Sequence, residues 1–569
     1  MSKVLAIHNS FFTDVNEFTS DGNVSLMIDG KLINSIATER VTRNKYDGSF
    51  ISSVETILER NSLQLTEIDT VLLCGFGKHI DEKKEEIDIY RQIKNIFSRN
   101  TEIIYYPSHH EVHAWCGLAE NSEANSLIAV IDNSGSILKY DSNSTNLEHA
   151  SVEQTSYYFW DGEKLELVAR DHNDFEDLGY GRFYSKVTRY IGFDSYHDAG
   201  KTMGLAPIHL ESSMFPNPYI EKDNREVTEL SHIKQDIEGL QDLSYWFNKQ
   251  GINIPQPFSG NKFSSYQARL AKWAQETIEQ SIIRRIKKLK ENYDFERIIM
   301  IGGVALNSVL NEAIENQLEL PVIIPSSPGD SGLSIGLLAK YNFTKYGKTK
   351  LAGYSAYLGF EYTDDEVVNV LSKYEEQLEY HNSNEVIQDT ARLLNSNKIV
   401  SWYQGRSEFG PRALGNRSIL ANPSNPWMKE IINNEIKCRE WFRPFAPSIL
   451  KEKLSEYFTS FSNDFDYMMK TAQTKKDKAS LIPSVIHNDY SARVQTVTKE
   501  NCPLYYQLIH AFYELSGLPI VLNTSFNLGG MPLVESPEDA VNCFLSSDYI
   551  DVLVIHDYII QKKLVNYAS

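Results

Sequence analysis

The sequence has few cysteines and no CxxC pair. Its five cysteines are odd in number and lie far apart, at Cys74, Cys116, Cys438, Cys502 and Cys543. This pattern argues against a framework of disulfide bonds. We therefore expect reduced, structural cysteines and a cytoplasmic protein.

The sequence also lacks an apolar run of about twenty residues, so we expect no membrane-spanning helix. The apolar stretch Val4–Ile7 is too short for the core of a signal peptide and is typical of a first β-strand. Positive charge is scarce, because 56 lysines and arginines face 76 acidic residues, for a net charge of -20. Nucleic-acid binding usually depends on basic surface, so this balance argues against a nucleic-acid partner.

The length of 569 residues exceeds one ordinary core and predicts two unequal domains, with a boundary near residue 350. The first part alternates short β-branched runs with turns, which is typical of α/β units. These runs are Val4–Ile7, Val24–Ile28, Lys31–Ile36, Thr70–Leu73 and Ser126–Ile131. We interpret the polar segment 212–262 as a surface excursion. The apolar spacing over 264–291 predicts a helix.

Two histidines at helical spacing suggest a metal site. Ser108 is a good N-cap, so His109 and His113 are expected on one face of a starting helix. Two imidazoles so placed can chelate one cation. Asp132 and Asp330 lie at strand ends beside small residues, and they are the candidate carboxylate ligands. An ordinary surface helix with unremarkable histidines is also compatible with this pattern.

Three glycine-rich turns follow predicted strands. Such turns let backbone N–H groups approach a phosphate, although each alone also fits an ordinary turn. Their order favours an actin-like ATPase fold. The candidate nucleotide-binding residues in them are Ser134, Gly135, Gly302, Gly303 and Asn307.

The strongest signal is the basic stretch 404–445. It contains seven lysines and arginines and four glutamates, a net charge of +3 within an acidic chain. Glycine, proline and aromatic residues separate the arginines, so they do not form one solvated helix face. Arginine grips phosphate bidentately, and we expect a rigid anion pocket. Arg493 and the polar strand end Asn523–Asn527 add a second phosphate-compatible edge, which alone would equally fit a capped strand.

Together these motifs resemble the carbamoyltransferase family that includes the nodulation, cephamycin and tobramycin O-carbamoyltransferases. The resemblance covers nearly the whole chain and is most specific over Glu408–Ala421 and Arg439–Pro447. It implies an α/β protein in two parts. An actin-like, Kae1-like carbamoyl-transfer domain would span residues 1–350, and an α+β, YrdC-like domain would span residues 351–569.

The resemblance also implies the reaction. The C-terminal domain would form carbamoyl adenylate from carbamoyl phosphate and ATP, with Mg²⁺. The intermediate would pass internally to the N-terminal domain, where the hydroxyl of a small molecule attacks it and AMP leaves. The acceptor would be a secondary metabolite such as an antibiotic, a toxin or a sugar derivative. By motif match, the metal ligands, with iron(II) as the ion, would be His109, His113, Asp132 and Asp330. The ligands of carbamoyl phosphate and ATP would be Arg412, Lys437, Arg443, Arg493 and Ser525.

The sequence departs from the family near the acceptor. The family usually carries a His-Asp-Ala-Ser-like run there, whereas this chain has the run Ser20–Asn23. Arg40 and Arg43, with the glutamate before them, are kept. Asp21 is then the candidate base or positioning residue, and the predicted catalytic set is Asp21, Arg412 and Lys437.

Two other functions share these features. A tRNA-modifying threonylcarbamoyl transferase has both domain types, but the acidic net charge argues against it. A non-enzymatic, ATP-dependent regulator on an actin-like scaffold would not need the arginine-rich pocket. We therefore predict an ATP-dependent O-carbamoyltransferase without nucleic-acid or membrane partners. Its oligomeric state is open, with a homodimer as one option.

Overall fold

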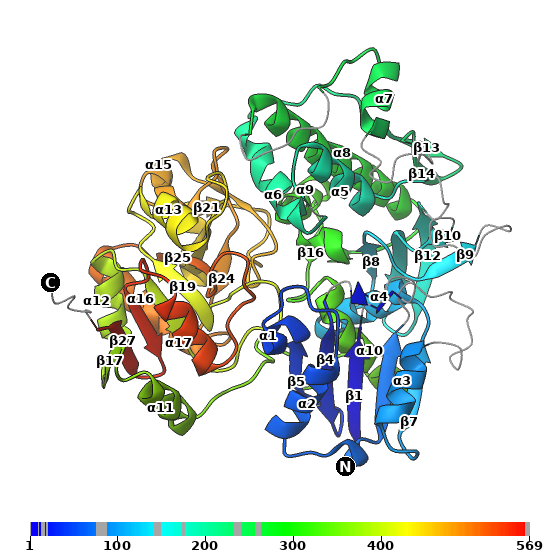
Figure 1. Cartoon of the computed structure of the whole chain (residues 1–569). Helices are drawn as coiled ribbons and strands as arrows, with labels where there is room; N and C mark the ends of the chain where they lie inside the picture. The colour runs from blue at the N-terminus through cyan, green and yellow to red at the C-terminus, as the bar shows by residue number, and fades with distance from the viewer. Residues whose placement is uncertain are drawn as a thin grey trace. The chain divides into compact units, whose positions relative to one another are not determined.

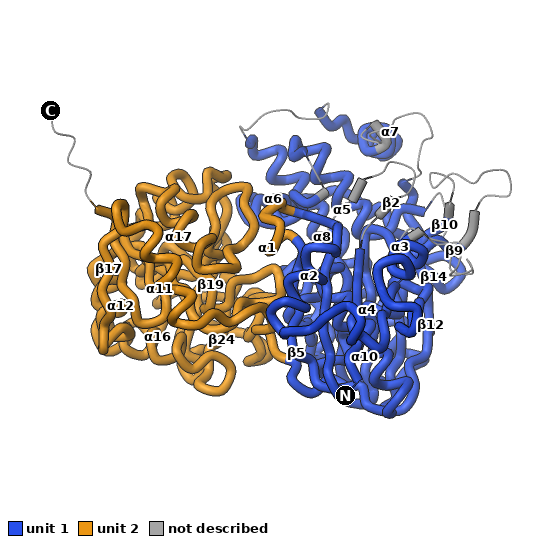
Figure 2. The backbone as a smooth tube through the Cα atoms, turned by 60° about the horizontal axis from the view of Figure 1, so that its bottom comes forward, with its two compact units in different colours: residues 1–38, 46–354 blue, residues 39–45, 355–569 orange. Residues whose placement is uncertain are grey.

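The computed structural model describes residues 2–9, 11–12, 17–18, 21–74, 88–140, 150–172, 177–194, 196–230, 241–255 and 263–563. The chain forms two compact units (Figure 2). Unit 1 comprises residues 1–38 and 46–354, and unit 2 comprises residues 39–45 and 355–569. The short segment 39–45 thus packs with the C-terminal part of the chain, and no sequence pattern predicts this excursion. The roles assigned to the two halves stay predictions.

Unit 1 contains two five-stranded sheets with the same succession of strand directions (Figure 1). The first sheet has the order β5 (Lys31–Ala37), β4 (Asn23–Ile28), β1 (Lys3–His8), β6 (Thr70–Cys74) and β7 (Glu102–Tyr106). The second has the order β12 (Leu165–Asp171), β11 (Thr155–Trp160), β8 (Ser126–Ile131), β15 (Arg297–Ile301) and β16 (Val322–Ile323). In each sheet three antiparallel strands precede two parallel ones. This duplication is typical of actin-like folds and confirms the predicted α/β class.

Two buried helices pack between the two sheets of unit 1. Helices α4 (His109–Glu120) and α10 (Leu333–Tyr346) pack against each other. Helix α4 also contacts β8 and β15, whereas α10 contacts β1, β4 and β6. Their close approach depends on Gly336, where a Cβ atom would lie 2.2 Å from the carbonyl oxygen of Val112. The N-terminal ends of the two helices consequently meet.

The long predicted helix is present as α8 (Ser265–Lys290). Ser264 and Gln267 form a capping box at its start, which fixes where it begins. Further helices of unit 1 are α2 (Ile51–Arg60), α3 (Asp88–Ile96), α5 (Tyr180–Tyr190), α6 (Ala199–Leu205) and α9 (Ser308–Leu318).

The segment before α8 is more than the surface excursion that we predicted. Its described residues include the hairpin of β13 (Tyr219–Lys222) and β14 (Arg225–Thr228), and the helix α7 (Gln241–Lys249). The rings of Trp246 and Phe247 lie 5.8 and 4.7 Å from the ring of Trp273 in α8. Aromatic burial anchors this segment, although its prolines and charges suggested an exposed loop.

Unit 2 is built on one eight-stranded mixed sheet. Its strand order is β17 (Leu378–Asn382), β27 (Tyr558–Lys562), β26 (Val552–Ile555), β18 (Val400–Tyr403), β19 (Arg417–Ala421), β25 (Ile520–Ser525), β20 (Ala446–Leu450) and β24 (Gln495–Val497). Helices α12 (Val386–Asn395) and α16 (Pro503–Ser516) pack together, and α16 contacts β20 and β25. Helices α11 (Asp364–Lys373) and α17 (Pro537–Leu545) form a second pair. This is the α+β arrangement that we predicted.

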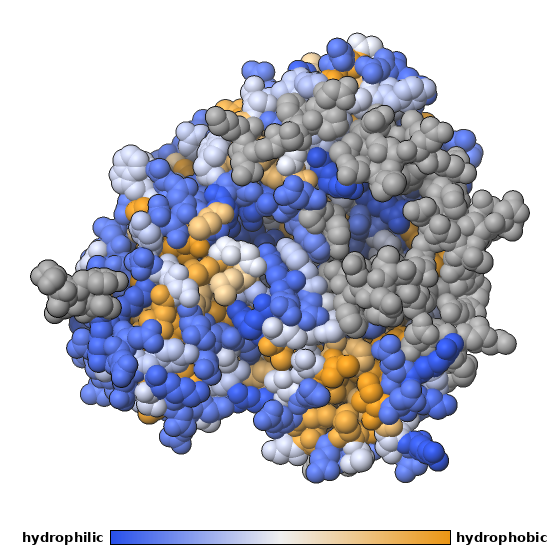
Figure 3. All heavy atoms as spheres, in the orientation of Figure 1, coloured by the Kyte–Doolittle hydropathy of each residue, from blue (hydrophilic) through white to orange (hydrophobic). Residues whose placement is uncertain are grey.

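The described residues contain no helix that is both long and apolar enough to cross a membrane. On the face drawn in Figure 3, hydrophilic residues predominate, and a larger hydrophobic patch lies over the sheet that contains β1.

Candidate functional site

The first candidate site begins where α4 starts. The hydroxyl of Ser108 accepts a hydrogen bond from the N–H of Glu111 at 3.1 Å and caps the helix. His109 and His113 lie one turn apart, and neither side chain is exposed. The alternative of an ordinary surface helix is wrong, because α4 is buried along most of its length.

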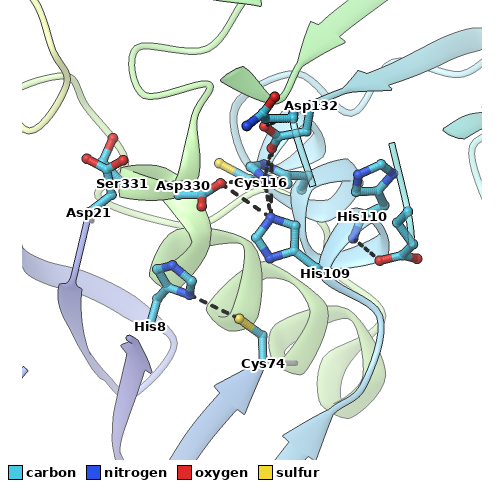
Figure 4. A network of polar contacts seen from close by, with 12 residues as sticks. His8, Asp21, Cys74, His109, His110, Cys116, Asp132, Asp330 and Ser331 are labelled. Carbon is cyan, nitrogen blue, oxygen red and sulfur yellow. Dashed lines mark hydrogen bonds and ion pairs between the residues drawn. The ribbon is translucent and has the colours of Figure 1, made fainter. Parts of the chain in front are cut away.

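Two carboxylates from other elements complete a compact cluster with these histidines. Figure 4 labels three of its members, His109, Asp132 and Asp330. Asp132 follows β8, and Asp330 opens the short turn before α10. His113 Nε2 lies 3.2 Å from Asp132 Oδ2 and 3.2 Å from Asp330 Oδ1. His109 Nε2 lies 3.3 Å from the same atom of Asp330, and the two Nε2 atoms are 3.1 Å apart. The structure therefore brings together all four residues that the sequence singled out as metal ligands.

The spacing of these donor atoms fits one cation. Ligands at about 2.0–2.2 Å from a metal ion stand about 3–3.5 Å from one another. The four donor atoms here all lie within 4.8 Å of one another. Apart from the imidazoles of the cluster itself, the buried Asp132 Oδ2 has no hydrogen-bond partner among the described residues, and a bound cation would satisfy it. Two imidazoles with two carboxylates suit iron or zinc better than magnesium or calcium.

Glycines make room for Asp132. Gly302 has a φ of +90°, and a Cβ atom there would lie 2.4 Å from the carbonyl oxygen of Ile131. At Gly303 a Cβ atom would lie 3.1 Å from Asp132 Oδ1. These glycines let the end of β15 approach the end of β8, where Asp132 follows. Their role in nucleotide binding stays a prediction.

Protonation and metal binding compete in this cluster. Burial alone would lower the pKa of His109, but the carboxylates, Asp330 foremost, raise it well above its usual value. Burial opposes ionisation of Asp330, yet His109 and His113 hold its pKa well below the usual range. A metal-bound histidine is neutral, so a cation would displace the protons that these imidazoles otherwise hold.

His8 and Cys74 lie beside the cluster and were missed by the sequence analysis. Each is the last residue of its strand, and these strands, β1 and β6, are parallel neighbours. His8 Nδ1 lies 3.3 Å from Cys74 Sγ, and the His8 ring lies 6.0 Å from the ring of His109. Burial lowers the pKa of His8 to about 3, so its imidazole is neutral at pH 7. The available signal was a histidine and a cysteine at the carboxyl ends of neighbouring strands.

A buried glutamate organises the start of α4. Glu153 accepts hydrogen bonds from the hydroxyl of Ser108 at 2.7 Å and from the N–H groups of His110 and Ser136 at 3.1 and 3.2 Å. Gly135 fits into the same place, where a Cβ atom would lie 3.0 Å from carbons of both Glu153 and His110. No sequence pattern marked Glu153, because its partners come from distant turns.

Two further predicted nucleotide-binding residues lie in separate turns of unit 1. Ser134 is half-buried in the turn after β8. Asn307 is the N-cap of α9, and its Oδ1 accepts from the N–H of Leu310 at 3.0 Å. Its Nδ2 donates to Gln275 at 2.8 Å. The side chain of Asn307 thus has structural partners, and its contact with a nucleotide stays a prediction.

Asp21 lies on the Asp330 side of the cluster (Figure 4). Its backbone is left-handed, with a φ of +62°. Asn23 Nδ2 lies 2.6 Å from the carbonyl oxygen of Asp21 and 2.9 Å from that of Asp330. The run that departs from the family pattern is therefore tied to a candidate metal ligand, while its first residue, Ser20, lies outside the described residues.

A second candidate site, in unit 2, consists of basic side chains. We define the cationic cluster as Arg412, Lys437, Arg439, Arg443 and Arg493. Burial, with repulsion from Arg443, lowers the pKa of Arg412 to about 10. Burial followed by repulsion from three other arginines holds the pKa of Arg493 well below its usual range. The four arginines are half-buried and Lys437 is buried. Partly desolvated cations that repel one another are stabilised by a multiply charged anion, and guanidinium groups suit phosphate.

Lys437 has hydrogen-bond partners within unit 2, and its contact with carbamoyl phosphate or ATP stays a prediction. Its Nζ donates to the carbonyl oxygens of Ser525 and Asn527, at 2.6 and 2.7 Å, and to Asn527 Oδ1 at 2.7 Å. Ser525 Oγ lies 3.3 Å from the same nitrogen. Burial, and repulsion from Arg439 next, hold the pKa of Lys437 well below its usual range. Lys437 therefore also orders the loop that carries Ser525.

Two residues beside the cluster were not in the predicted site. Burial, with repulsion from Arg439, lowers the pKa of Lys429. Burial lowers the pKa of His487 to about 4, and Arg493 and Lys429 contribute to this shift although Asp489 opposes it. Lys429 was visible as part of the basic stretch, whereas His487 had no sequence signal.

Comparison with protein families gives two matches. A model described as "Carbamoyltransferase N-terminus" matches residues 13–109 and 146–338. A model described as "Carbamoyltransferase C-terminus" matches residues 391–562. The first match includes His109 and Asp330, and the second includes the whole cationic cluster.

Individual proteins match over most of the chain. An uncharacterized protein of Methanocaldococcus jannaschii is 30% identical over 95% of this chain and 97% of its own length. The nodulation protein NolNO of Sinorhizobium fredii is 28% identical over 98% of this chain and 81% of its own length. Among solved structures, full-length HypF in a phosphate- and nucleotide-bound form has a TM-score of 0.37 at 14% identity, covering 61% of this chain and 47% of that chain.

Proposed function

This chain belongs to the carbamoyltransferase family and is a transferase enzyme, and we propose that it is an ATP-dependent O-carbamoyltransferase. The observation that carries the proposal is the cationic cluster of unit 2. Carbamoyl phosphate and ATP both carry several negative charges. A half-buried set of mutually repelling guanidinium groups is suited to such substrates.

In the proposed first step, carbamoyl phosphate and ATP meet at the cationic cluster. Water cleaves carbamoyl phosphate into carbamate and inorganic phosphate. A carbamate oxygen then bonds to the α-phosphorus of ATP, and the bond to the β-phosphate breaks as pyrophosphate leaves. Arg412, Arg443 and Arg493 would bind the phosphates, while Lys437 and Ser525 shape the adjoining loop. Mg²⁺ would accompany ATP.

In the proposed second step, the carbamoyl group moves to the acceptor in unit 1. The acceptor hydroxyl oxygen bonds to the carbonyl carbon of carbamoyl adenylate, and the bond from this carbon to AMP breaks. His109, His113, Asp132 and Asp330 would hold a divalent cation, which we assign as iron from the family resemblance. Such a cation supplies Lewis-acid polarisation of the carbonyl or neutralises the leaving phosphate. Asp21, on the Asp330 side, would receive or orient the hydroxyl proton.

We propose a small molecule with a free hydroxyl, such as a sugar derivative or another secondary metabolite, as the acceptor. A screen with labelled carbamoyl phosphate identifies it by transfer of the label. A tRNA acceptor is the alternative that the same screen tests, because labelled tRNA would then appear.

The test of the first step is release of pyrophosphate from ATP on addition of carbamoyl phosphate. Arg412→Ala should reduce this release by about a hundredfold or more, because the loss of one oriented charged donor has effects of that size. Arg392→Ala is the matched control, since Arg392 is an exposed arginine of unit 2 that pairs with Asp389 at 2.6 Å. Release by folded Arg412→Ala at the rate of this control would contradict the assignment.

A further inference from the structure

The segment Glu39–Lys45 belongs to unit 2, although the chain on both sides of it belongs to unit 1. We call this segment the strap. It contains the end of α1 (Thr38–Thr42) and the turn that follows, where Arg43 has a left-handed φ of +61°. Its arginines, Arg40 and Arg43, both donate hydrogen bonds to main-chain carbonyl groups of unit 2. No step of the proposed reaction uses them.

Arg40 holds the loop that carries Arg412. Its Nη1 donates to the carbonyl oxygen of Glu408 at 3.1 Å, and its Nη2 donates to that of Gly410 at 2.9 Å. Arg40 is 6% exposed, so these bonds are shielded from water. The carboxylate of Glu408 in turn accepts from the N–H of Leu414 at 2.7 Å. The loop is thus fixed on both sides of Arg412.

Arg43 holds a second loop, the one that binds Lys437. Its guanidinium donates to the carbonyl oxygens of Leu533 and Pro532 at 2.6 and 3.0 Å. The same loop includes Asn527, whose Oδ1 accepts from Lys437 Nζ at 2.7 Å. Arg40 and Arg43 therefore bind two loops that are far apart in the sequence. The first loop carries Arg412, and the second binds Lys437.

We propose that Arg40 and Arg43 are positioning residues for the anion pocket in unit 2. Their terminal N–H groups already donate to main-chain carbonyls, so they act through the loops rather than on the anion. Charged donors make the stronger hydrogen bonds to carbonyl groups, and a site loses function when its supporting contacts let it shift by about 1 Å. The proposal rests on the proposed function only for the identity of the natural anions.

The test uses the full-length protein and inorganic phosphate as the probe. Calorimetry measures phosphate affinity for wild type, Arg40→Ala, Arg43→Ala and the control Arg392→Ala, and thermal unfolding checks that each is folded. We expect each strap variant to bind phosphate about tenfold or more weakly, and the control to bind like wild type. Wild-type affinity in both folded strap variants would overturn the proposal, as would the absence of phosphate binding by wild type.

The lysine variants keep the test decisive if an alanine variant does not fold. Arg40→Lys and Arg43→Lys retain the charge but not the fork that reaches two carbonyl groups, so we expect intermediate phosphate affinities. Unchanged affinity in both lysine variants would then overturn the proposal.

Steady-state kinetics separate positioning from a merely structural role. Lost positioning should raise the KM for carbamoyl phosphate in pyrophosphate release, whereas simple loss of folded protein lowers kcat and leaves KM unchanged. A pure loss of kcat would therefore count against positioning. A wild type that binds phosphate but releases no pyrophosphate would disprove the proposed function, while the phosphate affinities would still decide the role of the strap.

Discussion

His109 is buried and Arg412 is half-buried, and the charges around them have opposite signs. Two carboxylates face His109, whereas Arg412 is repelled by Arg443 and by Arg493. The first arrangement holds a proton or a metal ion in place. The second has an excess of positive charge until an anion binds. These opposite charges support the cation proposed for unit 1 and the anion proposed for unit 2.

Anion binding in unit 2 should weaken as the pH rises. Burial and mutual repulsion place the pKa of Arg412 at about 10 and that of Lys437 well below its usual value. These groups lose their protons at lower pH than exposed ones, and with the protons they lose their attraction for an anion. We expect sulfate affinity, measured by calorimetry, to fall between pH 7 and 10, where the charge of sulfate itself is constant.

The lowered pKa values of Arg412 and Lys437 also determine whether the free energy of unfolding rises or falls with pH. Without an anion, and between the lowered and usual pKa values of these groups, the folded chain binds fewer protons than the unfolded chain. The free energy of unfolding contributed by these groups therefore rises with pH in that window.

Lys437→Gln should flatten the pH dependence of sulfate affinity. A sulfate affinity of wild type that does not change with pH would contradict this account.

At the scale of residues, the sequence predicted side chains whose role shows in their local spacing or in the composition of the stretch around them. His109 and His113 are spaced one helical turn apart, and Arg412 lies in a basic stretch, so both were visible. Glu153 was not predictable, because the hydrogen bonds that define its role come from turns brought together only by the fold.

At the scale of elements, the contact between α4 and α10 positions the candidate metal ligands. Helix α4 carries both histidines, and Asp330 lies directly before α10. A shift of one helix against the other would separate the imidazoles from this carboxylate. Gly336 permits the observed distance, because a side chain there would collide with the backbone of α4.

Gly336→Val should therefore destabilise unit 1 and reduce metal binding. The new Cβ would lie 2.2 Å from the carbonyl oxygen of Val112. Overpacking of this kind typically costs about 1–3 kcal/mol. Thermal unfolding and metal analysis measure the two effects. Gly200→Ala is the control, since nothing lies within 4 Å of a Cβ atom there. A stable Gly336→Val protein with full metal content would contradict the role given to this contact.

Elements with strong periodicity were predictable and irregular ones were not. Helix α8 has a sustained apolar face and a capping box, and its ends were predicted closely. The segment before it was not, because prolines and charges indicated a loop while Trp246 and Phe247 are buried against α8. Aromatic residues scattered in a polar segment give no periodic signal, although their burial stabilises it.

At the scale of the whole molecule, the chain passes from unit 1 to unit 2 and back at the strap before it enters unit 2 again after residue 354. Local patterns do not predict such an excursion, because it depends on contacts between residues hundreds of positions apart, such as Arg40 with Glu408. The family resemblance located both groups of charged residues and also marked Arg40 and Arg43, but it did not predict that these two arginines pack with unit 2.

We propose that the two units perform separable steps, with adenylation in unit 2 and metal-dependent transfer in unit 1. His113→Ala removes one of the four candidate ligands and leaves the cationic cluster unchanged. We expect the folded variant to lose metal binding. Among the described residues of this group, only one imidazole and two carboxylates would remain as ligands. Metal analysis and thermal unfolding establish this starting point.

The most direct measurement is then carbamoyl-phosphate-dependent release of pyrophosphate by metal-depleted His113→Ala, compared with wild type and with Arg412→Ala. We expect release close to the wild-type rate in His113→Ala, and a loss of about a hundredfold or more in Arg412→Ala. If release by folded His113→Ala falls as far as in Arg412→Ala, adenylation depends on the metal cluster of unit 1, and the division of the reaction between the two units is wrong.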